Sequence, residues 1–218
     1  MELRKSYDAD LARIKTRVEE MGLFAGAALG RALAALKSCD RAAALRVMEE
    51  DEEMDRQEKE LGHLCMALLL RQQPVAADLR RVSSALKLAT DLERMGDHAA
   101  DIAHMSLELE EGRPLPPVLE AMGRTALEMV QAALEAFLEE DPQKAAAVEA
   151  ADDRQDALFE QAKRELAEQI AAYPAGAGQV LSLLMVAKYL ERVSDHAVNL
   201  ARWAEFCCTG CYRGSRMV

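Results

Sequence analysis

Apolar residues recur every three or four positions along most of the chain, the pattern of amphipathic helices that each bury one face. The seam is clearest near the start, where Leu11, Ile14, Val18 and Met21 follow this spacing. The pattern predicts six long helices, over residues 6–37, 41–71, 77–109, 118–139, 142–172 and 179–206. We therefore expect an all-α fold.

Residues that favour caps and turns mark the ends of these helices. Asp40 and Asp141 stand where an N-cap is needed, and Pro142 suits the first helical position. Residues 111–117 contain three prolines and one glycine, so this segment cannot continue a helix. We expect it to be a linker at the midpoint of the chain.

One short block occurs twice. Residues 92–99 and 190–197 both read Leu-Glu-Arg-x-x-Asp-His-Ala. Further positions correspond at an offset of 101, such as Asp40 with Asp141, Asp51 with Asp152, and Asp55 with Asp156. Because helices joined by short loops pack antiparallel, each half should be a three-helix bundle. The chain is then an internal duplication of two tandem three-helix bundles, over residues 1–111 and 112–218.

The amino-acid composition further restricts the fold class and the possible binding partners. Half of the residues are hydrophobic but only 4% are aromatic, which favours helices over strands. A net charge of −11 argues against binding nucleic acid through a whole-surface field. No apolar run approaches the ~20 residues of a membrane span, and the N-terminus lacks the apolar core of a signal peptide. We expect a cytoplasmic protein.

The five cysteines show no disulfide framework, which fits a reducing compartment. Cys207, Cys208 and Cys211 lie close together near the C-terminus. Such a group could bind a soft metal or be redox-active, but a structural zinc site needs four ligands and no further cysteine or histidine is near in sequence. We interpret the segment as reduced thiols on a frayed terminus and assign it no function.

Acidic residues four positions apart lie on one helical face. Each repeat carries two such pairs on neighbouring helices: Asp51/Asp55 with Glu93/Asp97, and Asp152/Asp156 with Glu191/Asp195. Asp51 precedes the turn at Pro74 by as many residues as Asp97 follows it, and the same holds for Asp55 and Glu93. In an antiparallel hairpin the pairs face each other at equal heights. Each repeat should therefore gather four carboxylates at one place.

Four carboxylates at close quarters repel one another unless protons or a cation compensate them. Oxygen ligands without cysteine suit hard cations such as Mg²⁺, Mn²⁺, Ca²⁺ or iron. We expect metal ions there, with iron, Mn²⁺ and Mg²⁺ as the candidates. The candidate ligands are Asp51, Asp55, Glu93, Asp97, Asp101, Asp152, Asp156, Glu191 and Asp195. The alternative is a solvated acidic face.

We interpret the arginines and histidines of the repeated block as structural residues. Arg94 and Arg192 are expected to form ion pairs with the acids rather than to bind anions. His98 and His196 follow the aspartate by one residue, so each is rotated by about 100° from the acidic face. We expect both histidines at the surface or at an edge.

Catalysis has little support, because there is neither a phosphate-binding glycine loop nor a serine set up as a nucleophile. We expect a non-enzymatic protein. The first rival is a ferritin-like carboxylate di-metal oxidase or iron-storage protein, which needs two Glu-x-x-His pairs. Glu60/His63 fits that motif, and Asp101/His104 fits it loosely, but they lie away from the acidic level. The second rival is a helical adaptor that binds no metal.

The acidic pairs and the two Leu-Glu-Arg-x-x-Asp-His blocks, set in tandem three-helix repeats, resemble the PhoU family of phosphate-uptake regulators over nearly the whole chain. The resemblance implies metal clusters, iron among them, at those acids. It also implies a cytoplasmic homodimer that restrains phosphate import and the phosphate-starvation response. The implied partners are the ATPase subunit of the phosphate ABC transporter and a sensor histidine kinase.

Two departures distinguish the second repeat. Asn199 stands where the first repeat has Asp101, and Phe159 stands where it has Glu58. We expect the second cluster to be less negative and to bind metal more weakly.

Overall fold

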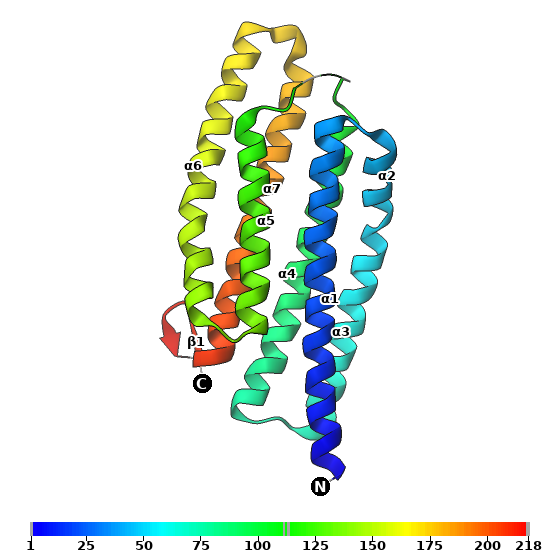
Figure 1. Ribbon diagram of the computed structural model, residues 1–218, viewed down its shortest axis with the longest axis vertical. Helices are drawn as coiled ribbons and strands as arrows, with labels where there is room; N and C mark the ends of the chain where they lie inside the picture. The colour runs from blue at the N-terminus through cyan, green and yellow to red at the C-terminus, as the bar shows by residue number, and fades with distance from the viewer. Residues whose placement is uncertain (1, 111, 113, 217–218) are drawn as a thin grey trace.

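The computed structural model describes residues 2–110, 112 and 114–216. Seven α-helices follow one another in this part of the chain: α1 (Glu2–Ser38), α2 (Arg41–Glu49), α3 (Asp51–Gln72), α4 (Ala76–Ser106), α5 (Pro117–Leu138), α6 (Pro142–Ala172) and α7 (Ala177–Thr209). In Figure 1 they form two groups side by side, with α5, α6 and α7 on the left and α1 to α4 on the right. The all-α prediction is confirmed.

The predicted helix over residues 41–71 is wrong in one respect, because it is two helices that meet at Glu50. Glu50 itself keeps helical dihedral angles, but the amide of Glu53 bonds to its carbonyl in a tighter turn. The three acids Asp51, Glu52 and Glu53 then occupy the first turn of α3, where the helix dipole favours negative charge.

The predicted caps are confirmed. The Asp40 carboxylate accepts a hydrogen bond from the backbone of Ala43, at 2.9 Å. Asp141 accepts one from Gln143 at 2.8 Å, with Pro142 in the first turn of α6. Between α6 and α7 the chain forms a short 3₁₀ turn, η1 (Pro174–Gly176).

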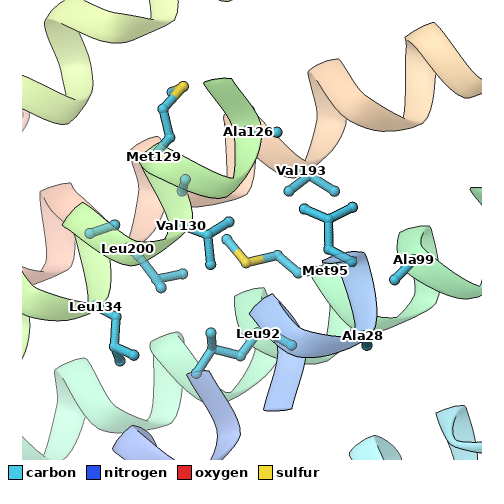
Figure 2. Packing of buried hydrophobic residues seen from close by; sticks show 14 of the residues in the cluster. Ala28, Leu92, Met95, Ala99, Ala126, Met129, Val130, Leu134, Val193 and Leu200 are labelled. Atoms are coloured by element: carbon cyan, nitrogen blue, oxygen red, sulfur yellow. The ribbon is translucent and has the colours of Figure 1, made fainter. Parts of the chain in front are cut away.

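The two groups of helices share one apolar core. Buried residues of α1, α4, α5 and α7 belong to a single cluster, and Figure 2 shows Met95 of α4 among side chains that include Val130 of α5 and Val193 of α7. α4 packs along α7, and α1 packs along α5. The predicted boundary between the repeats rests on Glu111, which lies outside the described residues, so residues 1–111 and 112–218 stay a prediction.

The α1–α5 contact has pseudo-twofold character. A Cβ atom on Gly22 of α1 would meet Leu134 of α5 at 2.6 Å, and one on Gly123 of α5 would meet Leu33 of α1 at 2.9 Å. Gly123 and Leu134 are the repeat equivalents of Gly22 and Leu33. Each glycine therefore makes room for the leucine of the other repeat.

The C-terminal segment is folded, so the expectation of a frayed terminus is wrong. β1 (Cys211–Tyr212) and β2 (Ser215–Arg216) pair antiparallel in a small hairpin. The Tyr212 ring lies 4.4 Å from that of Trp203 on α7, centroid to centroid, which ties the hairpin to the helix. All five cysteines are free thiols. No helix in the described ranges is long and apolar enough to cross a membrane.

Candidate metal centre

Three acids of the first repeat converge between α3 and α4. Carboxylate oxygens of Asp55, Glu93 and Asp97 all lie within 4.8 Å of one another. Asp55 comes from α3 and the other two from α4, one helical turn apart. The arrangement follows the predicted heights of the two helices. Within the described part of the chain, this is the one place where three such ligand atoms approach so closely.

Asp51 and Asp101 extend this group. Burial raises the pKa of Asp51, and the negative charges of Asp97, Asp55 and Asp101 raise it further. Burial likewise raises the pKa of Glu93, followed by the charge of Asp97. The five predicted carboxylates of the first repeat are therefore close enough to repel one another. A cation bound among them would reduce this repulsion.

One oxygen at this place has no partner. Oδ1 of Asp51 is buried and makes no hydrogen bond with a described residue. An unsatisfied buried oxygen is costly, and metal coordination is one way to satisfy it. The oxygen-only donor set is the type that hard cations prefer. The residues of the first cluster therefore fit a metal ion.

Basic side chains at the rim compensate only part of this charge. Arg94 lies 2.7 Å from Asp97 and 3.4 Å from Glu93, as its interpretation as an ion-pair partner predicts. Lys59 lies 3.3 Å from Asp55. Both cations are largely exposed, so these contacts are weak and are easily displaced.

The second cluster is arranged differently. Burial raises the pKa of both Asp152 and Asp195, and in each case a neighbouring carboxylate adds to the effect. Glu191, however, forms an ion pair with Lys188 at 2.5 Å. The Lys188 ammonium also lies 5.5 Å from the ring centroid of Phe159, the residue that replaces an acid. A lysine thus supplies a positive charge inside this cluster.

Lys188 was not among the residues predicted for this cluster. It precedes Glu191 by three residues, so helical spacing alone places both side chains on one face. The first repeat has Thr90 at the equivalent position and therefore lacks this cation. The structure gives the two clusters different charge balances.

Comparisons with known proteins match this architecture. The PhoU domain family profile covers residues 18–105 and 119–204, one match in each repeat. The chain belongs to the PhoU family. A phosphate-specific transport system accessory protein PhoU homolog from Xylella fastidiosa is 36% identical, over 94% of this chain and 88% of its own. A relative of the same description from Zymomonas mobilis is 34% identical over 94% and 88%.

Solved PhoU structures have the same fold. The crystal structure of PhoU from Pseudomonas aeruginosa matches with a TM-score of 0.89 and 32% identity, and covers 94% of this chain and 100% of its own. The regulatory protein PhoU from Streptococcus pneumoniae matches with a TM-score of 0.88 and 27% identity, over 94% and 98%. The predicted resemblance to the PhoU family is confirmed.

The prediction that both histidines lie at a surface or edge is wrong for His98. Its ring is buried between α4 and α7, stacked on Tyr189 at 5.6 Å and 5.7 Å from the ring of His196. His196 in turn lies 2.8 Å from Asp91. In this PhoU-family chain, the histidines of the repeated block mark the contact between the two repeats.

The motifs of the ferritin-like alternative do not meet. Glu60 and His63 line a groove beside α1 that also contains Arg13 and Arg17. Asp101 instead lies beside the acidic cluster, and no described group of close ligand atoms combines the two motifs. The PhoU fold of this chain gives that alternative no site.

Proposed function

We propose that this PhoU-family protein is a metal-binding regulator of phosphate transport. Family membership supports a non-enzymatic accessory role in phosphate transport. The observation that carries the metal-binding part is the convergence of Asp55, Glu93 and Asp97 between α3 and α4. Because the acids belong to two different helices, a bound cation would link them and stabilise their packing.

The first cluster would hold the metal through Asp51, Asp55, Glu93, Asp97 and Asp101. An iron, Mn²⁺ or Mg²⁺ ion would supply positive charge and cross-link carboxylates there. The cluster of Asp152, Asp156, Glu191 and Asp195 would bind metal more weakly, since Lys188 already neutralises part of its charge. Loss of metal from this second cluster should leave metal binding at the first cluster unchanged.

The regulatory part of the proposal concerns partners. The protein would act in the cytoplasm as a homodimer and as a negative regulator, by contact with the ATPase subunit of the phosphate ABC transporter and with a sensor histidine kinase. What supports this is the accessory role that the names of the relatives state.

Elemental analysis of purified protein tests the metal site. Wild type, Asp55→Ala/Asp97→Ala and Asp156→Ala/Asp195→Ala are purified without added metal and then after loading with iron, Mn²⁺ or Mg²⁺. We expect the first double variant to lose most of the bound metal and the second to lose much less. Metal content unchanged in Asp55→Ala/Asp97→Ala would refute the site.

Binding to the transporter tests the regulatory role separately. The purified ATPase subunit is titrated with this protein, and complex formation and ATP hydrolysis are measured together. We expect a complex and slower hydrolysis. Normal metal content with neither effect would reject the transporter contact while leaving the metal site in place.

A further inference from the structure

A polar groove lies where α4 meets α7, and Asp152 and Asp195 of the second acidic cluster form part of its lining. Its volume is about 570 Å³, within the range of roughly 300–1,000 Å³ typical of small-molecule pockets. Arg94 comes from α4, Arg192 and Arg202 from α7, and Arg213 from the C-terminal hairpin. We call it the arginine groove. Four guanidinium groups from three elements line a single recess of an acidic protein.

Acids in and around the arginine groove form ion pairs with two of its four arginines. Asp152 and Asp195 are the two carboxylates of its lining, against four arginines. Arg94 forms an ion pair with Asp97 at 2.7 Å, and Arg202 forms one with Glu149 at 3.4 Å. Counting Glu93 beside Arg94 as well, the acids in and next to the arginine groove are at least as many as its arginines. Affinity for an anion would therefore come from guanidinium donors that stay unpaired rather than from net charge.

Two of these arginines lack acidic partners. Arg192 makes no hydrogen bond or ion pair with any described residue, so its interpretation as an ion-pair partner is wrong. Arg213 contacts the ring of Tyr212 at 5.5 Å, and the described residues offer it no carboxylate within 4.0 Å. Both side chains are exposed and keep their donors available for a ligand.

The hairpin holds Arg213 at the arginine groove. Tyr212 pairs with Ser215, so Arg213 and Gly214 form a two-residue turn. Arg213 has a φ of 50°, a left-handed conformation that asparagine and glycine adopt far more readily. Tyr212 anchors this turn on Trp203. The family profile ends at residue 204, so the hairpin adds an arginine from beyond the matched domain.

Guanidinium groups suit a particular ligand. Their planar forks donate paired hydrogen bonds to phosphate oxygens, and arginine is preferred where such oxyanions are recognised. His98 and His196 also line the arginine groove. We propose that the arginine groove binds a phosphate-bearing ligand, held chiefly by Arg192 and Arg213. The arginine groove shares Asp152 and Asp195 with the weaker of the two proposed metal clusters, but Arg192 and Arg213 belong to neither cluster.

Calorimetric titration of chelator-treated, metal-free protein tests the proposal, because removing metal excludes binding through a bridging cation. Inorganic phosphate is the first probe and ATP the second, in a buffer without phosphate or sulfate. The variants are Arg192→Gln/Arg213→Gln and, as a matched control, Arg124→Gln, an exposed arginine on α5 outside the arginine groove. Circular dichroism checks that each variant is folded.

We expect binding of at least one probe, and a dissociation constant roughly tenfold or more higher in the double variant than in the control. Binding of inorganic phosphate identifies the free ion as sufficient, whereas binding of ATP alone identifies a phosphate ester. The proposal is overturned if neither probe binds, if the double variant binds like wild type, or if Arg124→Gln weakens binding equally. A metal-free protein that still binds phosphate also separates this result from failure of the metal centre.

Discussion

Asp51 begins α3 with one carboxylate oxygen buried and without a hydrogen-bond partner among the described residues. The charges of Asp97, Asp55 and Asp101 surround it. In the metal-free protein this arrangement opposes folding, because the carboxylate loses water and gains like-charged neighbours. The same features favour a bound cation, so affinity and stability are in conflict at this residue.

Asp51→Asn should therefore stabilise the metal-free protein at neutral pH while it weakens metal binding. The amide nearly matches the carboxylate in shape and removes the repelled charge. We expect a gain of about 1 kcal/mol, or roughly 2–4 °C in Tm for a chain of this size. Thermal unfolding with and without chelator measures both effects. Lower stability of the metal-free variant would contradict the repulsion inferred here.

The same residue predicts a pH dependence. Because burial raises the pKa of Asp51 in the folded state, the native protein holds this proton more tightly than the unfolded chain. That contribution to stability is fully present below the unfolded pKa, about 4, and is lost as pH rises through the folded pKa. The advantage of Asp51→Asn should thus be largest at pH 7 and shrink towards pH 4.

Urea unfolding of wild type and Asp51→Asn across that range measures the difference. Comparing the pair removes the opposite contribution of carboxylates such as Glu53, whose pKa is lowered by a hydrogen bond from Arg56. An advantage that stays constant with pH would show that Asp51 does not carry the effect.

The sequence predicts these acids well because a period of four and a shared turn determine their heights. It does not predict the environment of His98, since spacing shows that the ring leaves the acidic face but not which helix covers it. That helix is α7 of the other repeat, and nothing local in the block indicates this contact. The sequence also does not predict that Arg192 lacks an ion-pair partner, because spacing does not show which residues of other helices lie near it.

At the scale of elements, the α1–α5 contact depends on close approach at two glycines. Gly22 leaves space for Leu134 that a side chain would fill. Sequence periodicity identified both helices as amphipathic but gave no indication of which pair would cross so tightly. The break at Glu50 was equally hidden, because that residue keeps helical angles and no proline or glycine marks it.

Gly22→Val should destabilise the protein by about 1–3 kcal/mol, since the new side chain overlaps the Leu134 side chain and displaces it from its packing between α1 and α5. Gly26→Val on the same helix is the matched control. A Cβ atom at Gly26 meets nothing within 4 Å, and valine favours helix over glycine, so a small gain is expected. Chemical denaturation compares the two. Equal effects would mean that the approach at Gly22 is not limiting.

At the scale of the whole molecule, one core spans both repeats. Tandem three-helix units were predictable from the duplication, but their fusion into one packing unit was not, because the sequence pattern assigns apolar faces without assigning their partners. α4 and α7 therefore transmit the loss of packing from one repeat to the other.

Leu61→Ala on α3 tests this coupling. Leu61 is fully buried in the first repeat, and its truncation should cost about 2–5 kcal/mol. Trp203, the single tryptophan, lies in the second repeat. We expect its fluorescence transition to shift in urea together with the circular dichroism transition.

The control is Leu70→Ala on the same helix, which is 78% exposed and should change stability by less than about 0.5 kcal/mol. Two separate transitions in Leu61→Ala, with that of Trp203 unmoved, would show that the repeats unfold independently.

The contacts across the α4–α7 boundary are related by the internal repeat. His196 faces Asp91, and His98 faces Tyr189, the repeat equivalent of Asp91. Two copies of the first repeat alone would therefore place His98 of each opposite Asp91 of the other, in a contact that the present chain already makes once. The two repeats in this sense resemble a symmetric dimer joined end to end, in which Tyr189 and Lys188 stand where the first repeat has Asp91 and Thr90.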